Sequence, residues 1–137
     1  MKRRVSIVFI ICISLTLTCL VSACKKQEVG SDADGFTGVY TLVSVNGNAV
    51  PASVSHQGVM LQVRSGEFTI NADGTCKSKT VFVPPGGNEV TREVNATYTK
   101  DGMTLTMKWE GAGITVGTVE GDEFTMDNEG MIFVYKK

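Results

Sequence analysis

The sequence predicts an all-β protein, an antiparallel up-and-down barrel of eight strands that follows an N-terminal signal helix. From residue 36 onward, β-branched and aromatic residues alternate with polar ones in short runs, which is the period of a half-buried strand. Turn pairs such as Asn46-Gly47 and Asp73-Gly74 separate these runs at short intervals. A meander of this kind favours a barrel because closing the sheet removes its exposed edges.

Residues 1–23 have the organisation of an export signal: a basic start, an apolar run over Val5–Leu20 and small residues before Cys24. The segment Val21–Cys24 resembles the lipobox of bacterial lipoproteins. This resemblance implies that Cys24 is lipidated, begins the mature chain and binds the membrane through its acyl chains, such as palmitate. Under the family's sorting rule, Lys25 implies the outer membrane of the cell envelope. The alternatives are a retained transmembrane anchor, because the apolar run is nearly long enough to span a bilayer, and an export signal without lipidation.

The rest of the chain divides into a polar, flexible tether over residues 24–35 and one domain over residues 36–137. The chain has 13 Lys and Arg against 14 Asp and Glu, and loss of the leader removes Lys2, Arg3 and Arg4, so the mature chain is mildly acidic. A nucleic-acid partner is therefore not expected. Cys76 is the single cysteine after Cys24, which leaves no pair for an internal disulfide, and we expect it to be inert and buried.

The first half of the domain is predicted to contain three strands. The run Gly38–Val45 is the first, and Asn48–Gln57 is interpreted as a loop because it contains a proline. The second strand covers Val59–Asn71, where apolar residues change from odd to even positions, so we expect a bulge at residues 64–66. The third strand is Thr75–Val83.

The second half is predicted to contain five strands. Pro84–Gly87 begins a loop, and Glu89–Thr99 follows as a strand with alternating sides. The next strand should point Met103, Leu105, Met107 and Trp109 inward. The final strands are Ile114–Glu120, Glu123–Asp127 and Met131–Lys136.

Together these strands and turns resemble the small lipocalin-like domains of bacterial envelope lipoproteins. Lipocalins proper carry Gly-x-Trp in the first strand and a basic residue near the last strand that packs on the Trp. Here Tyr40 follows Gly38 in that position, and Lys136 and Lys137 end the chain. The resemblance implies an eight-stranded barrel, which side chains can fill or which can hold one small ligand. It is carried by Gly38–Gly47, Phe68–Thr75, Tyr98–Gly102, Gly117–Asp122 and Phe133–Tyr135.

No catalytic set, cofactor or metal site is predicted, so we expect a protein that is not an enzyme. The single histidine, His56, is placed in a solvated loop without a nucleophile at a characteristic spacing. Methionines on the inward face alternate with apolar residues and are interpreted as core or pocket lining rather than as soft-metal ligands. Acidic residues in the last turns lack calcium-loop spacing; they are Asp122, Glu123, Asp127 and Glu129.

The sequence favours a membrane-anchored barrel that binds a small hydrophobic or amphipathic ligand, with Pro84–Gly87 as a lid. Arg92 lies in the inward phase, where it would bind an anionic head group or reach the rim with its charged end. The predicted lining residues are Tyr40, Phe82, Arg92, Tyr98, Met107, Trp109, Phe124 and Phe133.

The alternative is a protein-interaction module with a filled barrel, such as an enzyme inhibitor or a component of an envelope complex. This hypothesis predicts an apolar patch on the outside of the barrel. It identifies no particular protein partner. The candidate patch residues, which lie out of phase with the inward set, are Val81, Val83, Ile132 and Val134.

Overall fold

The structure is a computed structural model that describes residues 35–137. The predicted signal helix, the predicted lipidation site Cys24 and the tether up to residue 34 lie outside the described residues. Every regular element from residue 35 onward is a β-strand, which confirms the predicted fold class for the domain.

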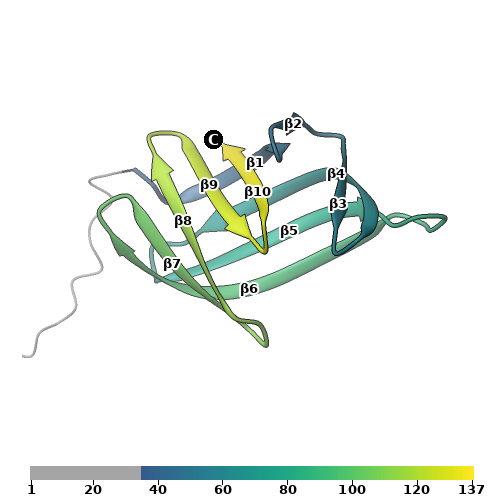
Figure 1. Cartoon of the computed structure of the whole chain (residues 1–137). Helices are drawn as coiled ribbons and strands as arrows, with labels where there is room; N and C mark the ends of the chain where they lie inside the picture. Colours follow the sequence, from purple (N-terminus) through teal and green to yellow (C-terminus); the bar gives the residue numbers. More distant parts are fainter. Residues whose placement is uncertain (1–34) are drawn as a thin grey trace, which may run out of the picture.

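Eight strands close into an antiparallel barrel (Figure 1). The barrel closes at β1, which pairs through its first half with β4 and through its second half with β10. Each of the other barrel strands pairs with its neighbours in the sequence. The predicted up-and-down barrel is confirmed. Its strands are β1 (Gly38–Val45), β4 (Val59–Ile70), β5 (Thr75–Val83), β6 (Val90–Asp101), β7 (Thr104–Trp109), β8 (Ile114–Glu120), β9 (Glu123–Asn128) and β10 (Met131–Lys136).

The segment predicted as a loop over Asn48–Gln57 instead contains two short strands, so that prediction is wrong. Asn46 and Gly47 have φ angles of 51° and 78°, the left-handed pair of a tight hairpin turn. This turn lets β2 (Asn48–Ala49) pair with the end of β1, and β3 (Ala52–His56) then pairs with the start of β4. The alternation in β3 is only five residues long and follows a proline, so it gave little signal in the sequence.

The predicted bulge lies in β4. Val63 pairs with Phe82 and Ser65 pairs with Val81, so Arg64 is the extra residue. Two positions later, a Cβ atom on Gly66 would lie 2.9 Å from the Leu42 side chain. Glycine at this position therefore allows β1 to cross close to β4, where the barrel closes.

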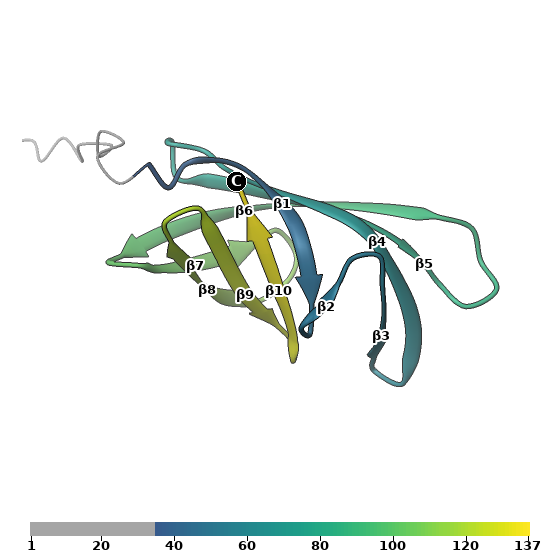
Figure 2. The ribbon, with the colours of Figure 1, turned by 90° about the horizontal axis from the view of Figure 1, so that it is seen from above.

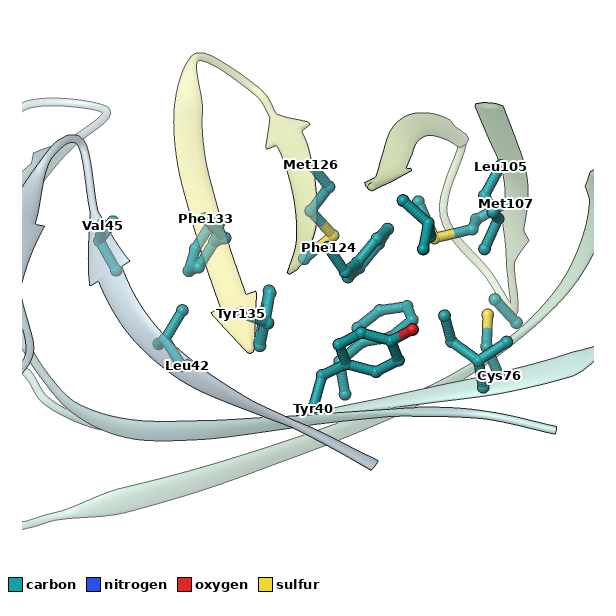
Figure 3. Close-up of a cluster of buried hydrophobic side chains, with 14 of the residues drawn as sticks. Tyr40, Leu42, Val45, Cys76, Leu105, Met107, Phe124, Met126, Phe133 and Tyr135 are labelled. Carbon is teal, nitrogen blue, oxygen red and sulfur yellow. The ribbon is translucent and has the colours of Figure 1, made fainter. Parts of the chain in front are cut away.

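Aromatic side chains from opposite walls meet inside the barrel (Figure 3). The ring centroids of Phe68 and Phe124 are 4.4 Å apart, and those of Phe68 and Tyr135 are 5.6 Å apart. A Cβ atom on Gly117 would lie 2.5 Å from the Phe124 ring, so the absence of a side chain on β8 makes room for this ring. The middle of the barrel is thus a packed core.

The two ends of the barrel differ (Figures 1 and 2). The N-terminal end holds Gly35, the turn at residues 71–74 and the last residue, Lys137. At the opposite end, here called the open end, β4, β5 and β6 run on past the other strands. There β6 pairs with β7 only from Ala96 onward, whereas its pairing with β5 begins at Val90. We call this extension the flap; it comprises residues 52–63, 80–83 and 90–94.

Candidate functional site

Half of the predicted ligand-lining residues form the core instead of surrounding a space. Tyr40, Met107 and Phe124 have no exposed surface, and Phe133 is 6% exposed. Tyr40 and Phe124 are in edge contact, with ring centroids 6.1 Å apart. All four side chains belong to the core cluster (Figure 3).

Tyr98, another predicted lining residue, takes part in closing the N-terminal end. Its ring makes an edge contact with Phe36, with centroids 6.1 Å apart. Its hydroxyl donates a hydrogen bond to the carbonyl oxygen of Asn71 at 2.7 Å. Lys100 Nζ lies over the Phe36 ring, 4.8 Å from its centroid. The residues that precede β1 are therefore fixed against the end of the barrel.

The last residue of the chain completes this closure. Lys137 Nζ lies 5.1 Å from the centroid of the Tyr40 ring and donates a hydrogen bond to the Gly35 carbonyl. Tyr40 in turn donates its hydroxyl hydrogen to the carbonyl oxygen of Phe36. The aromatic residue of β1 is thus covered by a basic residue after β10. Lys136, the other residue considered for this role, pairs with Glu123 at 3.3 Å.

At the open end, two predicted site residues lie on the inner face of the flap. Phe82 of β5 is half-buried and pairs directly with Val90 of β6, which is 42% exposed. Phe82 is not among the residues that pack on the core cluster. Arg92 pairs with Thr80 one step further inside, and its side chain is exposed. Its exposure fits the alternative in which the charged end reaches water at the rim.

Trp109, the remaining predicted residue, stands between the core and the open end. It is half-buried, and its Nε1 atom donates a hydrogen bond to Thr115 Oγ1 at 2.8 Å. Its ring makes an edge contact with Phe68 at 6.2 Å. Met103, which was expected to point inward on the same strand, is 57% exposed. That expectation is wrong because Met103 belongs to the turn before β7, beyond the end of the core.

The sequence did not single out Tyr135, whose hydroxyl group is the one buried side-chain polar atom in residues 35–137 without a hydrogen-bond partner. Tyr135 has no exposed surface. Burial raises the pKa of this hydroxyl well above its usual value, and the nearby Ser78 hydroxyl acts to lower it. Tyr135 is therefore a neutral donor at neutral pH. Its inward position followed from the alternation of β10, but its missing partner depends on the opposite wall.

A polar contact joins the tip of the flap to the β9–β10 turn at the rim of the open end. His56 Nε2 lies 3.4 Å from Glu129 Oε2, and Gln57 donates a hydrogen bond to the same oxygen at 3.2 Å. His56 is thus half-buried at the end of β3 and not in a solvated loop, which corrects the prediction. Gln57 and Glu129 have φ angles of 49° and 54°. These angles are unfavourable for residues with side chains of this kind.

The outer surface contains a shallow groove of about 690 Å³ over β4 to β7. Most of its lining residues have polar or charged side chains, and one of its lysines, Lys77, pairs with Glu93 at 3.4 Å. No sequence pattern predicts this groove, because it is formed by residues of four strands in a twisted sheet. Its lining includes Thr69, Asn71, Lys77, Asn95, Lys108 and Glu110.

The predicted outer apolar patch is divided between two walls. Val81 and Val83 lie on β5, whereas Ile132 and Val134 lie on β10, and β1 and β4 stand between these strands. Ile132 is 47% exposed, and the other three are half-buried. They do not form one continuous patch along neighbouring strands.

No group of three potential metal ligands occurs among residues 35–137. Cys76 is buried as expected, and burial raises the pKa of its thiol to about 11. Two acidic residues of the last turns form ion pairs, Glu123 with Lys136 and Glu129 with His56. Asp127 accepts a hydrogen bond from the Gly130 amide at 2.8 Å.

Comparisons with protein-family models, with curated proteins and with solved structures find no match to this chain. Within the part of the chain that the structure describes, no helix is long and apolar enough to cross a membrane.

Proposed function

We propose that this protein is a lipid-anchored, lipocalin-like envelope lipoprotein that binds a small amphipathic molecule at the open end of its barrel. The observation that carries the proposal is the uncovered inner face of the flap. There Phe82 does not pack on the core cluster, and Val90, which pairs with it, is 42% exposed. A ligand that covers such apolar surface gains about 25 cal/mol per Å² removed from water.

The charge at this end favours an anionic head group on the ligand. Arg92 lies on the same inner face, one pair away from Phe82 and Val90. Hydrogen bonds from a guanidinium group to a carboxylate or phosphate are stronger than those between neutral groups. An acyl chain against Phe82 and a carboxylate near Arg92 would satisfy both features. The Pro84–Gly87 segment, which connects β5 to β6 next to this pair, is the proposed lid.

The proposed ligand site is tested by binding of dodecanoate and of dodecyltrimethylammonium, which share a chain but differ in the charge of the head group. We expect the purified domain to bind dodecanoate more tightly, and we expect the Phe82→Ala substitution to weaken this binding. Val81→Ala is the matched control because Val81 precedes Phe82 on the outer side of the same strand. Equal binding by wild type and Phe82→Ala would contradict the proposed site, as would the absence of binding by the wild type.

The proposed location depends on Cys24, the lipidated residue, which would hold the domain at the outer membrane. Since Gly35 lies at the N-terminal end of the barrel, the open end would face away from the membrane. Replacement of Cys24 by Ala should release the domain from the membrane fraction, whereas replacement of Cys19 in the leader should not. A Cys24→Ala protein that still sediments with membranes would contradict the anchor.

A second candidate function is that of a protein-interaction module. It is favoured by apolar side chains on the outer wall: Ile114 and Val116 of β8 are 66% and 53% exposed. Exposed apolar clusters of this kind occur at protein contacts. If this function holds, Ile114→Glu should abolish capture of a specific envelope partner and leave dodecanoate binding unchanged. If Ile114→Glu retains both partner capture and dodecanoate binding, the outer wall around Ile114 is not the protein-interaction site.

A further inference from the structure

We propose that the Tyr135 hydroxyl is the polar anchor of the ligand site and donates a hydrogen bond to an acceptor oxygen on the ligand's head group. This inference rests on the proposed function and specifies the ligand further. The ligand is an amphipathic molecule that enters head group first and leaves its apolar chain against the flap.

The first observation is that this hydroxyl is buried and unpaired. Tyr135 has no exposed surface, and its hydroxyl has no hydrogen-bond partner. Almost all buried polar groups in folded proteins are paired, because an unpaired one loses its hydration without compensation. The other fully buried tyrosine, Tyr40, follows this rule, since its hydroxyl donates to the carbonyl oxygen of Phe36. Tyr135 is the exception among the buried tyrosines, and an acceptor atom on a ligand would pair its hydroxyl.

The second observation is the position of the nearby Ser78. On the inner face of β5, Cys76 is 1% exposed, whereas Ser78, Thr80 and Phe82 are all half-buried. Ser78 is thus the first residue of this face beyond the packed core. The Tyr135 hydroxyl lies close enough to Ser78 for the two groups to interact. The unpaired donor consequently lies at the boundary between the core and the accessible inner face.

The third observation is that the groups around this boundary suit one kind of head group. Tyr135 and Ser78 provide hydroxyl hydrogens, and Arg92 follows one pair further out, where it is opposite Thr80. Successive inner-face residues on a strand are about 6.6 Å apart. The long side chain of Arg92 can reach across this distance to the neighbouring inner-face position. A carboxylate between Tyr135 and Arg92 would receive hydrogen bonds from both sides, and its chain would pass Phe82 and Val90.

The inference is tested by comparing Tyr135→Phe with the matched variant Tyr40→Phe, with dodecanoate as the probe. We expect Tyr135→Phe to bind dodecanoate about 10- to 100-fold more weakly than wild type, the range for a lost hydrogen bond to a charged group. Tyr40→Phe should bind it as wild type does. In the absence of probe, Tyr135→Phe should melt at the same temperature as wild type or higher, since it removes an unpaired donor, whereas Tyr40→Phe should melt lower.

The outcomes separate this inference from the proposed function. Binding by wild type with unchanged binding by Tyr135→Phe would overturn the anchor and leave the ligand site at the flap in place. A melting temperature for Tyr135→Phe that falls as far as that of Tyr40→Phe would show an internal partner for the hydroxyl and would also overturn the anchor. If wild type does not bind dodecanoate, the proposed function and the anchor both fail.

Discussion

The two ends of the barrel use the same strand alternation with opposite results. At the N-terminal end, inward residues are covered by Phe36 and by the lysine contacts to Phe36 and Tyr40. At the open end, inward residues such as Phe82 and Val90 remain partly uncovered. An inward position therefore produces a core residue only where an opposite wall exists.

The difference arises from strand length. β4 and β6 have 12 residues each, whereas β7, β9 and β10 have six each. At about 3.3 Å per residue, the long strands extend some 20 Å beyond what the short ones can cover. The flap consists of this excess length together with β3, whose Ala52 and Val54 are buried in the core cluster. On the inner face of the flap, Phe82 and Val90 remain partly exposed.

The largest expected effect contrasts the core with the flap. Phe124→Ala should lower the free energy of unfolding by about 3–5 kcal/mol, because it leaves a cavity among packed rings. Phe82→Ala should lower it by about 1 kcal/mol or less, since Phe82 is only half-buried and does not pack on the core cluster. Urea denaturation of both variants measures the difference. Equal losses would show that Phe82 belongs to the core, and the comparison of the two ends would fail.

A smaller effect is expected from adding one methyl group in the core and one in the β7–β8 turn. Gly117→Ala should lower the free energy of unfolding by about 1–3 kcal/mol, because the new Cβ would lie 2.5 Å from the Phe124 ring. Gly113→Ala is the control, since a Cβ there has no neighbour within 4 Å. Thermal melting compares the two. A stable Gly117→Ala protein would indicate that the core has free space for Phe124 to move into.

The contact at the rim should affect local opening more than global stability. Glu129→Asn removes the carboxylate that contacts His56 and Gln57, but asparagine tolerates the left-handed φ at this turn better. We expect a change of about 0.5 kcal/mol or less in the free energy of unfolding and faster amide hydrogen exchange at Val54. Asn46→Asp is the control, because Asn46, like Glu129, has a positive φ and precedes a glycine in a tight turn. It should not change amide hydrogen exchange at Val54. Unchanged exchange in Glu129→Asn would show that the flap is held without this contact.

The smallest expected effect is a pH dependence at the N-terminal end. Hydrogen bonds from the Thr75 side chain and amide lower the pKa of Asp73. A carboxylate whose pKa is lowered in the folded state stabilises the protein at a pH above its unfolded-state pKa, which is near 3.8 for Asp73. This stabilisation is lost as the pH falls through the pKa of the folded state. Asp73→Asn should therefore melt with a weaker dependence on pH below about 4 than wild type. An unchanged acid dependence would show that the turn does not contribute.

Much of the barrel was predictable because it depends on local patterns. The alternation placed Leu105, Met107 and Phe124 inside, and the change of phase near Arg64 located the bulge. The missed strand β3 has too few residues to produce a pattern, and His56 was misplaced as a consequence. The candidate site was only partly predictable: Phe82 and Arg92 were identified, but Tyr135 was not.

The sequence by itself determined which residues point inward, since strand alternation is set by the backbone over a few residues. It also determined the turns, through pairs such as Asn46-Gly47. Only the tertiary structure decided which inward residues are covered, that Glu129 meets His56 and that the Tyr135 hydroxyl has no partner. These outcomes depend on what stands on the opposite wall, and that wall is brought there by strands distant in the sequence.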